Sequence, residues 1–214
     1  LGELTFRCDS RALVPRSPLM SVIHDGYSPW FSQKAPKRIV DVCCGGGSLG
    51  LLAAYHAPES EVLMLDIDAE ALALAESNRR DLGLPNTVCV QTNLLRTLAP
   101  GSVDIILANP PYVDAEDMNN LPQEYRHEPS IALAAGDDGL DLVHDLLRQA
   151  AVVLSDHGML FLEVGNSAPA LTSSYPDIAF IWLDLASGGH GVCGVSAGEL
   201  KASIALTDPS PSQV

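Results

Sequence analysis

The chain has 214 residues, of which 47% are hydrophobic and 5% aromatic, and its formal net charge at pH 7 is -15. This composition fits one α/β domain with a sizeable core, and no apolar run reaches the roughly 20 residues that a membrane-spanning helix requires. An acidic surface repels phosphate backbones, so the charge disfavours direct nucleic-acid binding and favours a basic protein as partner.

The five cysteines are odd in number, and three of them fall in or beside apolar, strand-like runs. Buried free thiols of this kind are typical of a reducing compartment, and we expect the cytoplasm. Neither the cysteines nor the six histidines have the spacing of metal ligands, so we expect no metal site. The chain starts in mid-pattern without a signal peptide, and we expect a further helical domain upstream.

Residues 1–32 are expected to form a hairpin and a linking helix before the main domain. The segment 4–14 reads as a β-hairpin that turns at Cys8-Asp9-Ser10. Pro18 suits the first turn of a helix with Ser17 as its N-cap, and apolar residues then recur at helical spacing up to about Trp30.

The main domain, residues 33–202, alternates apolar runs of strand length with helical patterns, which predicts βαβ units and a parallel sheet. The predicted strands span residues 38–43, 61–65, 87–92, 103–108 and 159–164, and the predicted helices span 49–56, 69–82, 138–154 and 167–175. Asp68 is the expected cap of the second helix, and Gly83 ends it. Segments 178–185 and 192–195 read as a closing antiparallel pair, and residues 203–214 as a disordered tail.

A glycine turn follows the first predicted strand. Gly45, Gly47 and Gly50 fit the pattern G-x-G-x-x-G, and Asp66 ends the next strand. Glycines let the backbone approach a ligand closely, and a carboxylate in this place can accept both hydroxyls of a ribose. The pattern predicts a ribose-bearing nucleotide without separating a dinucleotide from S-adenosylmethionine. Asp41, among apolar neighbours, either hydrogen-bonds the turn or reaches the cofactor's amino group.

The fourth strand ends abruptly in Asn109-Pro110-Pro111-Tyr112. Proline lacks the N–H that a ladder needs and disfavours helix at the residue before it, so the chain turns rigidly at the sheet's carboxyl edge. The Asn109 side chain and the Pro110 carbonyl can accept the two protons of a planar –NH2 group, and Tyr112 offers a face to pack on it. We expect this corner to hold a planar nitrogen during a group transfer.

The order of glycine turn, acid and Asn-Pro-Pro-Tyr resembles the class I S-adenosylmethionine-dependent methyltransferases that alkylate planar nitrogens. Within them, the chain looks very like the protein glutamine methyltransferases that act on a large-subunit ribosomal protein. The resemblance covers about residues 4–200 and is carried by segments 13–18, 109–118, 121–122, 124–129, 136–140, 163–167 and 175–177. It implies a Rossmann-like, seven-stranded, mostly parallel sheet with helices on both faces and an antiparallel C-terminal strand.

The resemblance also implies roles for individual residues. Asn109 and Pro110 would accept the amide protons of a substrate glutamine, and Tyr112 would pack beside it. The turn from Cys43 would wrap the methionine part of the cofactor, and Asp66 would hold its ribose. The implied cofactor-binding set is Phe6, Asp41, Cys43, Gly45, Gly46, Gly47, Asp66, Ile67, Asn93, Leu94 and Asn109.

The sequence departs from the family's usual pattern in two places, after the third predicted strand and in the glycine turn. Asn93 stands where an aspartate is common, and Cys44 and Gly46 stand where threonine and serine are usual. Both changes bear on cofactor affinity more than on fold. Three alternatives stay open: an adenine amino methyltransferase acting on nucleic acid, a dinucleotide-dependent oxidoreductase, and a relative that binds the cofactor without turnover. His190, between two glycines, is expected to be a turn residue.

Overall fold

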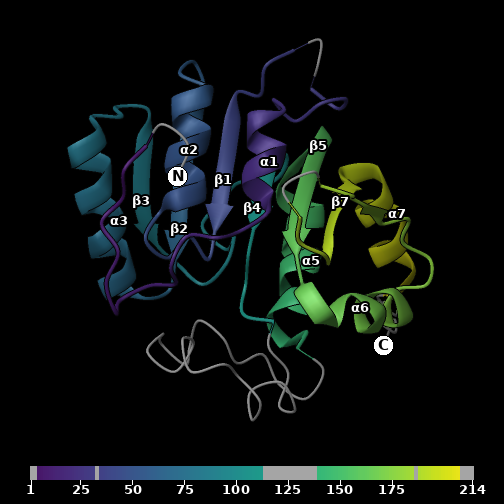
Figure 1. Cartoon of the computed structure of the whole chain (residues 1–214). Helices are drawn as coiled ribbons and strands as arrows, with labels where there is room; N and C mark the ends of the chain where they lie inside the picture. The colour runs from purple at the N-terminus through teal and green to yellow at the C-terminus, as the bar shows by residue number, and fades with distance from the viewer. Residues whose placement is uncertain (1–3, 32–33, 113–138, 186–187, 208–214) are drawn as a thin grey trace, which may run out of the picture.

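The computed structural model describes residues 4–31, 34–112, 139–185 and 188–207 (Figure 1). Seven strands form one sheet in the order β3-β2-β1-β4-β5-β7-β6. The strands are β1 (Arg38–Val42), β2 (Glu61–Asp66), β3 (Thr87–Gln91), β4 (Val103–Ala108), β5 (Leu154–Glu163), β6 (Ile181–Trp182) and β7 (Val192–Ser196). Strands β1 to β5 pair in parallel, whereas β7 is antiparallel to β5 and β6. The predicted fold class is confirmed.

Helices cover both faces of the sheet (Figure 1). One face carries α1 (Leu19–His24), α2 (Ser48–His56) and α3 (Ala69–Leu82), and the other carries α5 (Asp141–Val153), α6 (Ala168–Ser174) and α7 (Ala197–Thr207). Ile39 and Val40 of β1 are both fully buried, one in the core of each face. Burial on both faces explains why the parallel strands read as continuous apolar runs.

The caps predicted for α3 are confirmed. The Asp68 carboxylate accepts a hydrogen bond from the Glu70 N–H (2.9 Å), and Gly83 ends the helix with φ of 64°. A carboxylate at an N-cap satisfies an otherwise unpaired donor, and a left-handed C-terminal residue favours glycine. Among the residues described, no helix is both long enough and apolar enough to cross a membrane.

The predicted hairpin over residues 4–14 is wrong. This segment contains no strand and runs as an irregular strap, residues 4–18, along the carboxyl edge of the sheet and past α3. The Arg7 N–H donates to Oδ1 of Asn78 (2.8 Å) instead of to a partner strand. The helix predicted up to Trp30 also ends early, at His24, and the chain turns through Gly26 and Tyr27 with φ of 61° and 59°.

Two further boundaries differ from prediction near the C-terminus. The strand predicted over residues 178–185 is reduced to the two residues of β6. Helix α7 continues through Thr207, so the prediction of a disordered tail is wrong for residues 203–207. Ala197 and Leu200 are fully buried in the core beneath α5 and β5, and this burial stabilises a helix that composition alone does not indicate. The segment 109–137 shows neither helical nor strand periodicity in the sequence, and its residues from 113 onward lie outside the described residues.

Candidate functional site

A cavity of about 540 Å3 opens at the carboxyl ends of β1, β2, β4 and β5. The sheet order reverses between β1 and β4, and open α/β sheets place their ligands at such a switch point. The volume lies within the range of small-molecule sites. The strap contributes one wall, and its segments 11–18 lie against the cavity together with the glycine turn and the Asn-Pro-Pro-Tyr corner.

The glycine turn combines a ligand-facing part with a packing part. Gly45 and Gly46 line the cavity, and Gly45 has φ of 52°, which favours glycine. Gly47 and Gly50 are absent from the cavity wall: a Cβ on Gly50 would lie 2.6 Å from Cγ of Met64, so α2 can approach β2 only with glycine there. The pattern G-x-G-x-x-G is therefore divided between ligand approach and helix–strand packing.

Cys43 begins this turn with φ of 58°, a left-handed conformation that is unusual for a residue other than glycine. It also lines the cavity. Burial raises the pKa of its thiol, and the negative charges of Asp66 and Asp41 raise it further. A thiol held neutral in this way is a poor nucleophile, which favours a packing role for Cys43 in the cavity wall.

Two carboxylates face the cavity from β1 and β2. Asp41 is 1% exposed and accepts on Oδ2 the N–H of Gly50 (2.8 Å), which lies in the first turn of α2. Burial raises the pKa of Asp41 to about 7, a shift that the Gly50 N–H opposes and the charge of Asp66 reinforces. Asp66 accepts the N–H groups of Gly45 (2.8 Å) and Asp68 (3.0 Å), and burial raises its pKa as well. These contacts fix the Asp66 carboxylate at the end of β2.

The Asn-Pro-Pro-Tyr corner also lines the cavity and directly follows β4. Pro110 and Pro111 are buried, whereas Asn109 and Tyr112 are partly exposed. The Tyr112 hydroxyl donates to Oε1 of Glu163 (2.9 Å), and its carbonyl accepts the Ser167 hydroxyl (3.0 Å). The structure thus brings the corner and the glycine turn to one cavity, as their places at neighbouring strand ends predict.

Of the predicted site residues, nine line the cavity and four do not. The nine are Asp41, Cys43, Gly45, Gly46, Asp66, Ile67, Asn109, Pro110 and Tyr112. The four outside its wall are Phe6, Gly47, Asn93 and Leu94. Leu94 is 5% exposed and packs in the core, and Phe6 packs between two core clusters on the α2 face. The roles predicted for these residues stay predictions.

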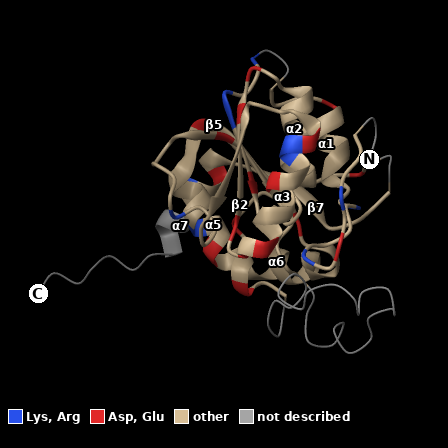
Figure 2. Ribbon diagram, turned by 90° about the vertical axis from the view of Figure 1, so that its left-hand side faces the viewer, with Lys and Arg blue, Asp and Glu red and all other residues tan. Residues whose placement is uncertain are grey.

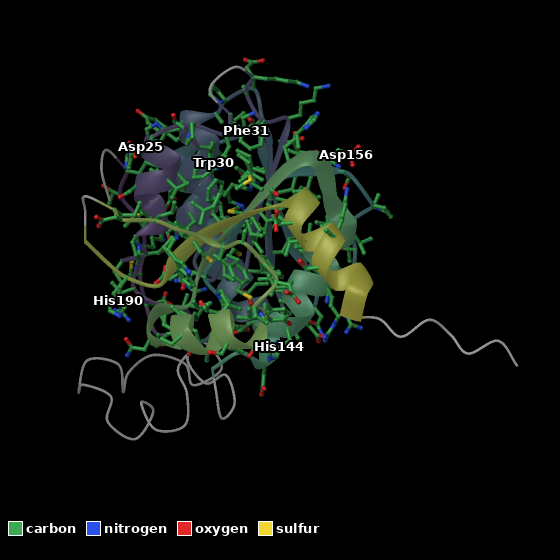
Figure 3. The ribbon with its side chains drawn as sticks, turned by 90° about the vertical axis from the view of Figure 1, so that its right-hand side faces the viewer. Asp25, Trp30, Phe31, His144, Asp156 and His190 are labelled. Atoms are coloured by element: carbon green, nitrogen blue, oxygen red, sulfur yellow. The ribbon has the colours of Figure 1, made fainter. Side chains whose placement is uncertain are left out.

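Several cavity residues carry no local signal that singles them out. They are Ser17, Asn78, Asn166 and His190. Glu163 also lines the cavity and does carry a signal, because it is an acid that ends an apolar strand, as Asp66 is. His190 does lie in a bend, as predicted, and contacts Oδ1 of Asn166 through Nε2 (2.8 Å). Figure 3 shows it at the end of the molecule opposite Trp30 and Asp156. Within the described ranges, no three His, Cys, Asp or Glu side chains gather as metal ligands.

The sequence was compared with known proteins. It is 40% identical over 199 residues to the ribosomal protein uL3 glutamine methyltransferase of Xanthomonas campestris pv. campestris, covering 93% of this chain and 65% of that protein. It is 39% identical over 192 residues to the protein of the same name from Neisseria gonorrhoeae, covering 89% of this chain and 64% of that protein. The chain thus spans slightly less than two thirds of the length of each relative.

Solved structures resemble the fold at low sequence identity. The catalytic domain of hMettl16, crystallised with a MAT2A 3'UTR hairpin, gives a TM-score of 0.68 at 15% identity over 91% of this chain and 76% of that one. The Thermus thermophilus 16S rRNA methyltransferase RsmC, solved with AdoMet and guanosine, gives 0.59 at 17% identity over 86% of this chain and 43% of that one. These likenesses concern the fold alone. Residues 29–137 match the family model "Methyltransferase small domain", so the chain belongs to the family of methyltransferases that carry this domain.

Proposed function

We propose that the protein transfers the methyl group of S-adenosylmethionine to the side-chain amide nitrogen of a glutamine in ribosomal protein uL3. The proposal rests chiefly on one observation: Asn109 and Pro110 line the same cavity as the glycine turn. The two relatives at about 40% identity are named for this activity on uL3. A basic ribosomal protein also suits a chain of net charge -15.

The cavity fits the cofactor. Its volume of about 540 Å3 suits a nucleoside-sized ligand, and the open backbone at Gly45 and Gly46 allows close approach. Asp66 presents a fixed carboxylate for the ribose hydroxyls, and Ile67 is 55% exposed beside it, which offers an apolar surface to the adenine. The buried Asp41 would balance the cofactor's amino group.

The protein's contribution to the reaction is alignment. An amide nitrogen is a poor nucleophile because its lone pair is delocalised, and S-adenosylmethionine supplies a methyl group already activated by its sulfonium. Oδ1 of Asn109 and the carbonyl of Pro110 would accept the two amide protons, which orients the –NH2 group and favours the positive charge that develops on nitrogen. Tyr112 would pack against the amide plane. The amide nitrogen would gain the methyl group as the bond between the methyl group and the sulfonium sulfur breaks, and it would release one proton to water.

The decisive experiment is methyl transfer from labelled S-adenosylmethionine to large-subunit ribosomal proteins that lack the modification. We expect label in uL3, on a glutamine identified by mass spectrometry. DNA and RNA are counted in parallel, and label there would revive an adenine methyltransferase. Tight cofactor binding without any transfer would indicate an inactive relative, and a nicotinamide cofactor that raises the melting temperature would indicate an oxidoreductase.

A further inference from the structure

The Glu163 carboxylate lies between two segments that are far apart in sequence. It ends β5 and is 6% exposed. Its Oε2 accepts the hydroxyl of Ser17 in the strap, and its Oε1 accepts the hydroxyl of Tyr112 in the corner (2.9 Å). One carboxylate oxygen therefore accepts a hydrogen bond from the strap and the other accepts one from the corner. All three side chains line the cavity.

The surroundings of Glu163 act on its pKa in two directions. Burial raises its pKa, and the two hydroxyl hydrogen bonds, together with the charge of Arg16, act in the opposite direction. A buried carboxylate is unfavourable unless its oxygens are hydrogen-bonded, so losing either hydroxyl leaves an acceptor without its donor. The two hydroxyls thus share one buried acceptor, although they belong to segments that are far apart in sequence.

Two further contacts fix Tyr112, and a third supports one of them. Gly165, directly beyond β5, lies so close that an added Cβ would be 2.6 Å from Cε2 of the tyrosine ring. The Ser167 hydroxyl donates to the Tyr112 carbonyl (3.0 Å). A Cβ on Gly191 would lie 2.1 Å from the Gly165 carbonyl oxygen. The loop before β7 therefore packs against Gly165 and holds it next to the tyrosine ring. The ring next to the corner therefore has one packed position, with its hydroxyl on Glu163.

Ser17 fixes the other wall in a similar way. It is 7% exposed, and its hydroxyl oxygen accepts the Leu19 N–H (3.2 Å) while its proton goes to Glu163. The contact places the end of the strap where α1 begins. A Cβ on Gly189 would lie 2.6 Å from Cγ of Pro18, so the loop before β7 packs on the strap as well. Pro15 to Pro18 therefore keep a defined place over the cavity.

We propose that Glu163 is a positioning residue, which ties the strap wall of the cofactor cavity to the Asn-Pro-Pro-Tyr corner and so holds methyl donor and target amide at a fixed separation. This inference rests on the proposed function. Glu163 acts through Tyr112 and Ser17 and is assigned no contact with the reacting atoms. Small misplacements of reacting groups cost large factors in rate, so the tie affects turnover more than binding.

A double-mutant cycle tests the tie, because Ser17→Ala and Tyr112→Phe each delete one hydroxyl. In the protein with Glu163, we expect the losses in kcat to be non-additive by about fivefold, and the urea midpoints to be non-additive as well. In a Glu163→Gln background the non-additivity should vanish, and Glu163→Gln alone should lower kcat about tenfold with a smaller change in KM.

Asp104→Asn is the matched control. Asp104 is also a carboxylate in a strand of this sheet, and it accepts the Ser155 hydroxyl (3.0 Å) and the Lys37 N–H (2.7 Å) at the edge away from the cavity. We expect it to lower the urea midpoint and leave kcat within twofold. Additive urea midpoints for Ser17 and Tyr112 would overturn the tie itself. Non-additive midpoints with additive kcat losses would overturn the positioning role, and absence of transfer by the unmutated protein would reject the proposed function instead.

Discussion

At the scale of single residues, the largest loss of activity is expected from substitution of Asn109. Asn109→Ala removes one of two proposed acceptors for the target amide and should lower methyl transfer about 10²- to 10³-fold, because such acceptors act where charge develops. Cofactor affinity should change less than threefold. The control is Asn86→Ala. Asn86 lies in the loop before β3, and its side-chain amide donates to the carbonyls of Ala54 (3.3 Å) and Ser60 (3.0 Å). Equal losses of kcat in both variants would contradict the role of Asn109.

A second residue-scale prediction concerns Asp41 and pH. The pKa of Asp41 is about 7 in the folded protein, above its ordinary value of 3.8. Between about pH 4 and 7, therefore, Asp41 holds a proton in the folded state and has none in the unfolded state. The associated stability is complete below pH 4 and is lost as pH rises through 7, with a slope of up to about 1.4 kcal/mol per pH unit. Asp66 and Glu163 are shifted in the same direction.

Asp41→Asn keeps an acceptor for the Gly50 N–H and removes the titration. In the cofactor-free protein, urea midpoints measured at pH 5, 6 and 7 should fall with rising pH, and the variant should show a slope smaller by about one proton. Parallel slopes in the two proteins would show that Asp41 does not titrate in this range. Glu76 does not interfere, because Arg79 lowers its pKa to about 2 and its effect lies at more acidic pH.

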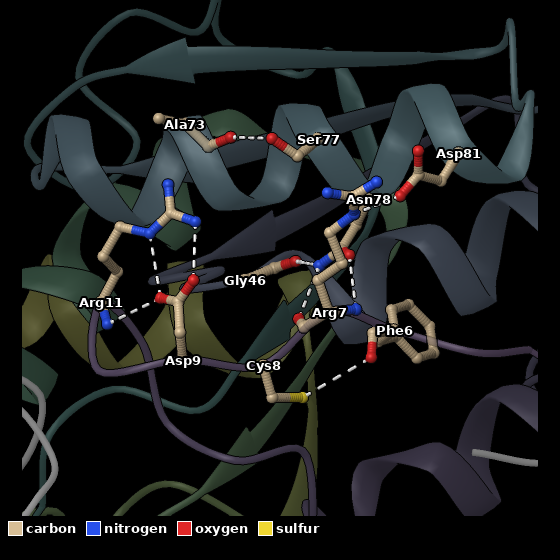
Figure 4. Close-up of polar contacts among 10 residues, drawn as sticks. All are labelled: Phe6, Arg7, Cys8, Asp9, Arg11, Gly46, Ala73, Ser77, Asn78 and Asp81. Atoms are coloured by element: carbon tan, nitrogen blue, oxygen red, sulfur yellow. Dashed lines mark hydrogen bonds and ion pairs between the residues drawn. The ribbon is translucent and has the colours of Figure 1, made fainter.

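At the scale of elements, a buried amide of α3 holds the start of the strap. Asn78 is 2% exposed, accepts the Arg7 N–H on Oδ1 (2.8 Å), and donates to the carbonyls of Arg7 (3.2 Å) and Gly46 (2.9 Å), as Figure 4 shows. Asn78→Ala leaves these backbone groups unpaired and releases both the strap and the glycine turn. We expect the Kd of S-adenosylhomocysteine to rise about tenfold, measured by calorimetry.

The neighbouring helix position supplies the control for Asn78. The Ser77 hydroxyl donates only within α3, to the carbonyl of Ala73 (2.8 Å; Figure 4), so Ser77→Ala should leave the dissociation constant within twofold. A tenfold loss of affinity in both variants would mean that α3 itself, and not the strap, is responsible.

The strap also shows where inference from the sequence stops. Elements whose hydrogen bonds are local, such as α3 with Asp68 and Gly83 at its ends, are predictable from their own residues. The backbone of Arg7 is paired with Asn78, 71 positions away, and no local pattern distinguishes this from a hairpin. The contact between Ser17 and Glu163 spans 146 positions and has no local pattern either. The glycine turn and the corner are recognisable in the sequence because each directly follows a buried strand, and β1 and β4 are neighbours in the sheet.

At the scale of the whole molecule, the net charge acts on a basic substrate at longer range than any contact. Acidic residues are distributed over the ribbon and are not gathered on one element (Figure 2). With a net charge of -15, the molecule should attract a basic ribosomal protein from a distance. Salt screens such attraction between exposed charges, with a Debye length of about 10 Å at 0.1 M.

If charge attracts the substrate, salt should slow the association of enzyme and substrate and leave the rate of the chemical step unchanged. Raising NaCl from 50 to 500 mM should lower kcat/KM for uL3 about tenfold while kcat changes less than twofold, because screening acts on association. A short uncharged peptide that contains the same glutamine is the control, and its kcat/KM should stay within twofold. If the peptide loses as much as uL3, salt is acting on the cavity itself. If uL3 shows no loss, the acidic surface contributes nothing to substrate choice, and recognition then depends on the contacts at the corner.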